Sequence, residues 1–135
     1  MNIVLFGDSH LGGFGKSPTL QLESLIENSP IYNCSAGGFT STDGVKRAEF
    51  ISQLDPDVVI FSYGGNDVAP WKTIVSKDTY LQNMQKIFEA FPNARKILFT
   101  SPDVLLDEPT HTSQYNDSMH DYQAALEVIR DEFGV

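Results

Sequence analysis

The chain has 135 residues, of which 41% are hydrophobic, and it carries a formal net charge of −9 with a pI near 4.5. This length and composition predict one globular domain over residues 1–135 with a core of its own. The acidic balance argues against a nucleic-acid partner, which needs a basic face, and against anionic membrane surfaces. The sequence shows no apolar run as long as a membrane span and no secretory leader, so we expect a cytoplasmic location.

Cys34 is the only cysteine, which excludes an intramolecular disulfide and argues against a cysteine-built metal site. It lies in an apolar stretch, where a buried structural thiol is a better interpretation than a reactive one. We therefore expect neither a metal nor a cofactor.

Strand-like and helix-like segments alternate along the chain. Apolar runs predict four strands, at residues 2–6, 31–34, 57–63 and 96–100. Helical periodicity predicts four helices, at residues 19–28, 42–54, from the Ser76 N-cap to Pro92, and from about 119 to 133 with Gly134 as the C-cap.

This β-α alternation predicts an α/β fold, a three-layer sandwich with a parallel sheet and right-handed crossovers. The third strand-like run, residues 58–61, is apolar without alternation, which is typical of a central parallel strand covered on both faces. Residues 102–116 are rich in Pro, Thr, Ser and Asp, and we expect them to form the longest loop and one wall of an active site.

The last predicted helix leads to Gly134 and Val135 with no strand after it. Ending there would leave the fourth strand as an apolar edge, which natural sheets avoid. The sequence therefore predicts a domain that is incomplete at its C-terminus, with a fifth strand missing.

The segment Gly7-Asp8-Ser9 directly follows the first apolar run. Open parallel sheets place their ligands at the carboxyl ends of strands, and glycine permits a tight turn there. Ser9 is therefore a candidate nucleophile, although a helix-capping serine is the alternative for this pattern taken alone.

Two further turns follow predicted strands. The Gly37-Gly38 pair comes after the second strand and lets a backbone N–H approach a bound substrate. Gly64-Gly65-Asn66-Asp67 comes after the third strand and places an amide side chain near the same edge of the sheet. Each turn alone has an ordinary structural interpretation, but together they supply the parts of one acyl-transfer site.

These segments resemble the first three sequence blocks of the SGNH hydrolases, also called GDSL-type lipases and esterases. The matching residues are Gly7-Asp8-Ser9, Gly38 and Gly64-x-Asn66-Asp67, within residues 1–101. The resemblance implies a flavodoxin-like five-stranded parallel sheet of order 2-1-3-4-5. It also implies a serine esterase that acts on carboxylic esters.

By this resemblance Ser9 is the nucleophile, and its backbone N–H forms an oxyanion hole with the N–H of Gly38 and the Asn66 side chain. Gly37 is the alternative to Gly38. Asp8 is expected to fix the turn by accepting hydrogen bonds from backbone N–H groups rather than to relay protons.

His10 stands where the family usually has leucine. We expect it to face the substrate or to cap the helix rather than to be the general base, because neighbours along a tight turn rarely point together.

The family's general base lies in an Asp-x-x-His segment after the fifth strand. Here Asp117-Ser118-Met119-His120 has the matching letters but precedes the last predicted helix. We interpret it as a helix start, with the base beyond residue 135, so that the chain as printed hydrolyses esters poorly. The alternatives are that Asp117 and His120 form the dyad or, with less support, that His111 is the base.

Two other function classes remain open on the sequence. His10 to Ser17 resembles a phosphate loop that ends in Gly15-Lys16-Ser17, but it has histidine where that pattern needs glycine, and Pro18 fits poorly into a helix starting at the lysine. A non-catalytic ligand-binding domain of the same fold is the second alternative.

The substrate is not fixed by the sequence. Phe39 and Trp71 follow strand-end motifs and are candidate apolar walls of the pocket, although core packing or plain exposure explains them as well. Esters of small acyl groups, acetylated carbohydrates and lipids all fit a small-molecule partner, and the sequence does not indicate an oligomeric state.

Overall fold

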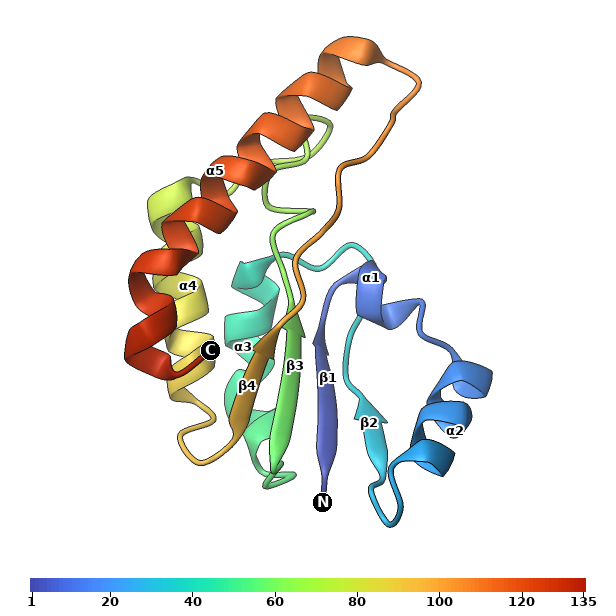
Figure 1. Cartoon of the computed structure of the whole chain (residues 1–135). Helices are drawn as coiled ribbons and strands as arrows, with labels where there is room; N and C mark the ends of the chain where they lie inside the picture. Colours follow the sequence, from blue (N-terminus) through green and yellow to red (C-terminus); the bar gives the residue numbers. More distant parts are fainter.

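The computed structural model describes all residues, 1–135, and has a four-stranded sheet (Figure 1). The strands are β1 (Ile3–Gly7), β2 (Ile31–Asn33), β3 (Val58–Ser62) and β4 (Arg95–Leu98). Their order is β2-β1-β3-β4, and every pairing is parallel. The predicted α/β fold with its parallel sheet is confirmed.

Five helices connect and follow the strands: α1 (Ser9–Gly12), α2 (Lys16–Leu25), α3 (Ser41–Ser52), α4 (Lys77–Glu89) and α5 (Pro109–Phe133). Figure 1 shows α3, α4 and α5 on one face of the sheet and α1 and α2 on the other. None of these helices combines the length and the hydrophobicity needed to cross a bilayer.

The larger core lies between the sheet and α3, α4 and α5. Phe61 of β3 is fully buried and meets Phe88 of α4 and Phe91 edge to face, at centroid distances of 5.2 and 5.7 Å. Phe6 of β1 joins the same cluster. Edge-to-face contacts between aromatic rings add to the free energy of burial, so this cluster stabilises the centre of the sheet.

The second core, under α1 and α2, is much smaller. Its buried members are Ile3, Leu5, Leu11 and Ile31. On this side of β3, Val58 and Ile60 are only half-buried, whereas Val59 and Phe61 on the opposite side are fully buried. The predicted central position of the third strand is confirmed, but its cover is unequal, because Val58 and Ile60 pack only partly buried against the smaller core.

The predicted start of the last helix is also wrong: α5 begins at Pro109, ten residues before the expected position. The Glu108 side chain caps the helix by accepting a hydrogen bond from the N–H of Thr110. Proline is favoured in the first turn because an N–H at that position would have no acceptor within the helix. The loop after β4 consequently spans residues 99–108, so the prediction that residues 102–116 form the longest loop is wrong: residues 109–116 are helical, and the segment between β3 and α4, residues 63–76, is longer.

The helix α2 begins at Lys16, three residues earlier than predicted, with Pro18 in its first turn. The first N–H groups of a helix have no intrahelical acceptor, so proline is tolerated there. The argument that Pro18 is incompatible with a helix starting at Lys16 is therefore wrong.

Truncation of Phe61 tests the central aromatic cluster. We expect Phe61→Ala to lower the free energy of unfolding by about 3–5 kcal/mol, because it leaves a cavity in the larger core. Phe50→Ala is the matched control, since Phe50 is 76% exposed, and its effect should stay within about 0.5 kcal/mol. Urea denaturation of both variants measures the difference, and equal effects would contradict this description of the core.

Candidate active site

Ser9 lies at the carboxyl end of β1 because the chain turns sharply after Gly7. A Cβ atom on Gly7 would lie 2.2 Å from the Ser62 carbonyl oxygen of β3, so only glycine fits between these strands. The buried Asp8 then caps α1, and its Oδ1 accepts a hydrogen bond from the His10 N–H at 3.0 Å. Ser9 is therefore the first residue of α1, exposed, and its own N–H has no intrahelical acceptor.

The glycine loop after β2 lies beside Ser9. A Cβ atom on Gly37 would lie 3.9 Å from the Ser9 Cβ, so the two backbones approach closely. Gly38 has a φ of +78°, a conformation that favours glycine. The N–H groups of Gly37 and Gly38 donate to no acceptor in the chain, so either is free to bind an oxyanion.

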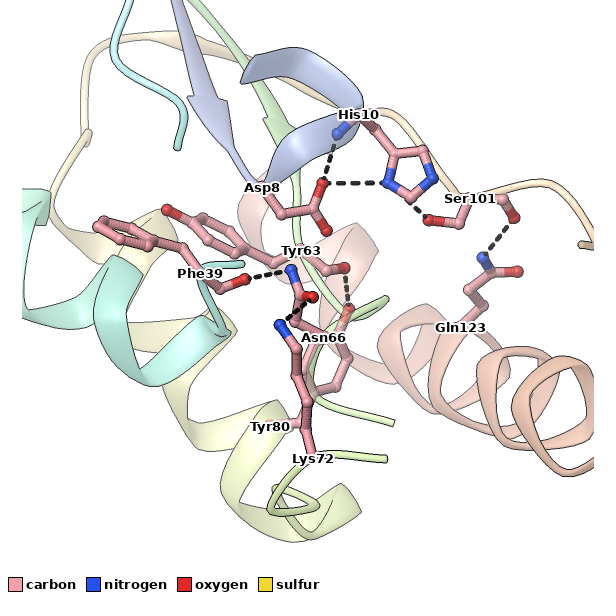
Figure 2. A network of polar contacts seen from close by, with 9 residues as sticks. All are labelled: Asp8, His10, Phe39, Tyr63, Asn66, Lys72, Tyr80, Ser101 and Gln123. Carbon is pink, nitrogen blue, oxygen red and sulfur yellow. Dashed lines mark hydrogen bonds and ion pairs between the residues drawn. The ribbon is translucent and has the colours of Figure 1, made fainter. Parts of the chain in front are cut away.

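The loop after β3 brings the Asn66 amide to the same place. Its Nδ2 donates a hydrogen bond to the Phe39 carbonyl at 2.9 Å, and its Oδ1 accepts one from Lys72 Nζ at 2.8 Å (Figure 2). An amide nitrogen carries two hydrogens. The ammonium of Lys72 therefore fixes which way the amide faces, and one Nδ2 hydrogen has no partner in the chain.

A second buried carboxylate, Asp67, holds this loop against α3. Asp67 is fully buried and accepts hydrogen bonds from the N–H and the hydroxyl of Ser41, the first residue of α3. The Ser41 hydroxyl in turn accepts a hydrogen bond from Asn83 of α4. Burial raises the pKa of Asp67, and the hydrogen bonds from Ser41 oppose that rise.

His10 is paired with Asp8. Its Nδ1 lies 3.1 Å from Asp8 Oδ1 and 3.5 Å from the Ser101 hydroxyl. Figure 2 draws both contacts as dashed lines. A carboxylate only accepts hydrogen bonds, so in the neutral form of the imidazole Nδ1 carries the proton and Nε2 is an acceptor. No group of the chain donates to Nε2.

Ser9, His10 and Asn66 share one cavity of about 170 Å³, which neither Gly37 nor Gly38 lines. It is lined by Asp8, Ser9, His10, Gly65, Asn66, Trp71, Val104, Leu106 and Tyr115. The structure thus brings together Ser9 and Asn66 from two of the three predicted motifs, and the loop after β4 supplies a wall, as expected. Trp71 lines the cavity, whereas Phe39 packs against the guanidinium of Arg47.

The remaining histidines lie elsewhere. His120 is part of α5, not at its start, and its Nε2 lies 2.6 Å from Asp103 rather than near Asp117. His111 packs against Trp71 at a centroid distance of 6.2 Å. Neither of these histidines lines the cavity beside Ser9.

Several contributors to the site carry no sequence signal. Lys72 lies in an irregular segment, and only the fold brings its side chain to Asn66. Asn116 of α5 bonds both the N–H and the carbonyl of Val104, and Thr112 accepts a hydrogen bond from the N–H of Leu106.

No group of three His, Cys, Asp or Glu side chains converges as a metal site. Burial raises the pKa of the half-buried Cys34 thiol, which disfavours the reactive thiolate.

The sequence and the fold match known hydrolases. The model of the GDSL-like Lipase/Acylhydrolase family matches residues 5–135. The sequence has no match among curated proteins.

Solved structures with the same fold include TesA, a lipase/acylhydrolase from Enterococcus faecalis and a GDSL-like lipase from Bacteroides thetaiotaomicron. Their sequence identities are 18%, 22% and 18%, with TM-scores of 0.75, 0.75 and 0.74. The alignments cover 100%, 94% and 99% of this chain but 76%, 71% and 65% of those chains. The chain therefore spans about two thirds to three quarters of their length.

Removal of the Asp67 carboxylate tests how the site is held. We expect Asp67→Ala to lower the free energy of unfolding by about 1–3 kcal/mol, because the buried N–H of Ser41 loses its acceptor. Asp107→Ala is the control, because Asp107 is exposed and its side chain makes no hydrogen bond. Thermal unfolding compares the two, and an unchanged Asp67→Ala variant would show that the loop and α3 are held together in another way.

Proposed function

Since the chain belongs to the GDSL-like lipase/acylhydrolase family and is thereby a hydrolase acting on ester bonds, we propose that it cleaves carboxylic esters through an acyl-enzyme on Ser9. One observation carries this proposal: the exposed Ser9 and the Asn66 amide, which has an unpartnered N–H, line the same cavity. A nucleophile and an oxyanion donor in one cavity are the two parts that acyl transfer needs.

In the proposed reaction the Ser9 Oγ attacks the carbonyl carbon and loses its proton to a general base. Negative charge then develops on the carbonyl oxygen, where the N–H groups of Ser9 and Gly38 and the Asn66 amide donate hydrogen bonds to it. Gly37 remains the alternative donor to Gly38. The alcohol leaves with the proton returned by the base, and water releases the acid from Ser9 by the same steps.

Asp117 and His120 have no role in this proposal, because neither lines the cavity beside Ser9. Asp8 acts through structure: it fixes the turn by accepting the His10 N–H and supports the orientation of Ser9 without touching the substrate carbonyl. Lys72 has a comparable supporting role toward Asn66.

Covalent labelling tests the nucleophile. We expect a fluorophosphonate probe to modify Ser9, detected by intact-mass and peptide mass spectrometry, and Ser9→Ala to abolish the modification. Ser17→Ala is the matched control, since Ser17 is exposed on α2 and makes no side-chain hydrogen bond. If Ser9 is modified no faster than Ser17, the chain is better described as a non-catalytic binding domain of the same fold.

Truncation of Asn66 tests the oxyanion donor. We expect Asn66→Ala to lower kcat for p-nitrophenyl acetate by about 10²- to 10³-fold with little change in KM, because this hydrogen bond strengthens as the oxyanion forms. Asn93→Ala is the control, since Asn93 is exposed and distant from the cavity. An unchanged kcat in Asn66→Ala would remove Asn66 from the mechanism.

A further inference from the structure

We propose that Lys72 is a positioning residue for the reaction at Ser9 and that it acts by its positive charge: the ammonium holds the Asn66 amide in its donor orientation and makes the free N–H a stronger donor. This role rests on the proposed function of Ser9 and Asn66. It assigns part of the catalytic rate to a charge that does not itself line the cavity.

Lys72 is a cation without a carboxylate partner. The chain has 18 Asp and Glu residues against nine Lys and Arg, so acidic partners are plentiful, yet no ion pair of the chain includes Lys72. Its Nζ instead lies 2.8 Å from the Oδ1 of Asn66, a contact drawn in Figure 2, and 3.4 Å from the carbonyl oxygen of Gly38. Because neither acceptor carries a charge, the positive charge of Lys72 is not neutralised by these contacts.

The backbone beside Lys72 is held by the fold. The N–H of Lys72 donates to the carbonyl of the fully buried Ala69 at 3.0 Å. The N–H of Val75 donates to the carbonyl of Asp67 at 2.9 Å, which closes the segment between them. Since Asp67 directly follows Asn66, the ammonium reaches the amide from a backbone that is already ordered, and the contact costs little further conformational entropy.

The other side of the Asn66 amide is fixed by Phe39. The Nδ2 of Asn66 donates to the Phe39 carbonyl at 2.9 Å, and the Phe39 ring lies 5.1 Å from the guanidinium carbon of Arg47, a cation–π contact. A flipped amide would set Oδ1 against a carbonyl oxygen and Nδ2 against an ammonium, and both contacts would be repulsive. The amide therefore has one favourable orientation, in which the second Nδ2 hydrogen has no partner in the chain.

The charge of Lys72 also changes the strength of this donor. An ammonium on the carbonyl oxygen of an amide draws electron density toward that oxygen, and hydrogen bonds that share one group strengthen each other. The remaining Nδ2 hydrogen of Asn66 thereby becomes a better donor. The gain is largest when the acceptor turns from a neutral carbonyl oxygen into an oxyanion, so we expect the effect in kcat rather than in KM.

Removal of the charge tests this role. We expect Lys72→Met to lower kcat for p-nitrophenyl acetate by about tenfold with KM unchanged, because the donor remains but is less well held and less polarised. Lys72→Arg keeps the charge and should recover at least about threefold of this loss, since a guanidinium also donates to an amide oxygen.

Lys46→Met is the matched control for the lost charge. Lys46 is exposed on α3, and its side chain makes no hydrogen bond or ion pair, so we expect its kcat to stay unchanged. Equal kcat values in Lys72→Met and Lys46→Met, or a rise in KM alone in Lys72→Met, would overturn the role of Lys72.

A double-mutant cycle separates an action through Asn66 from a general effect of charge. In the Asn66→Ala background we expect Lys72→Met to change kcat by less than about twofold, because no amide is left for the ammonium to hold. Equal losses in the two backgrounds would show that Lys72 acts without Asn66, which would overturn the proposal.

The Asn66 side-chain amide gives a readout that needs no catalysis. Its two N–H signals are assigned in the NMR spectrum of the isotope-labelled chain by their loss in Asn66→Ala. We expect Lys72→Met to shift these signals and Lys46→Met to leave them in place, because only Lys72 contacts Oδ1. Unshifted signals in Lys72→Met would overturn the proposal. This measurement is independent of Ser9 labelling, so failure of the Lys72 contact and failure of the acyl-enzyme can be told apart.

Discussion

The buried carboxylate of Asp8 is the contact on which the site depends. It lies between the end of β1 and the start of α1, and one of its oxygens accepts hydrogen bonds from both the N–H and the ring of His10. This contact starts α1 at Ser9, with only Asp8 between strand and helix, and Ser9 is thereby exposed at the edge of the sheet. Because the same oxygen also holds the imidazole, the position of the nucleophile and the orientation of His10 have one common cause.

The surrounding structure accommodates the cost of burying two carboxylates at this edge. Asp67 is as buried as Asp8, and the charge of Asp8 contributes to the raised pKa of Asp67. Four donors of the chain, the N–H and hydroxyl of Ser41 and the N–H and ring Nδ1 of His10, replace part of the lost hydration, whereas Asp8 Oδ2 is buried without a partner. Asp8 fixes the turn that carries Ser9, and Asp67 fixes the loop that carries Asn66. The nucleophile and the amide are thus positioned by different carboxylates.

The sequence was sufficient for the sheet and for the motifs at its edge, because both depend on local patterns. Apolar runs predict strands, and glycines at strand ends predict turns wherever the chain must pass another backbone, as Gly7 passes Ser62. The start of α5 at Pro109 was missed because the Glu108 cap is an uncommon one. Lys72 and Asn116 could not be found, because their roles arise from contacts between segments that only the folded chain brings together.

The difference between local patterns and contacts made only in the folded chain also applies to Asp117-x-x-His120, which matches the family's motif in sequence but not in position. A motif specifies chemistry only when its strand or helix delivers the side chains to the reacting atoms. On α5 the His120 ring contacts Asp103, outside the cavity. His10 belongs to no recognised motif, yet it lines the cavity and its Nδ1 contacts the buried carboxylate of Asp8. The position of a histidine relative to a carboxylate and a cavity is thus more informative here than its spacing along the chain.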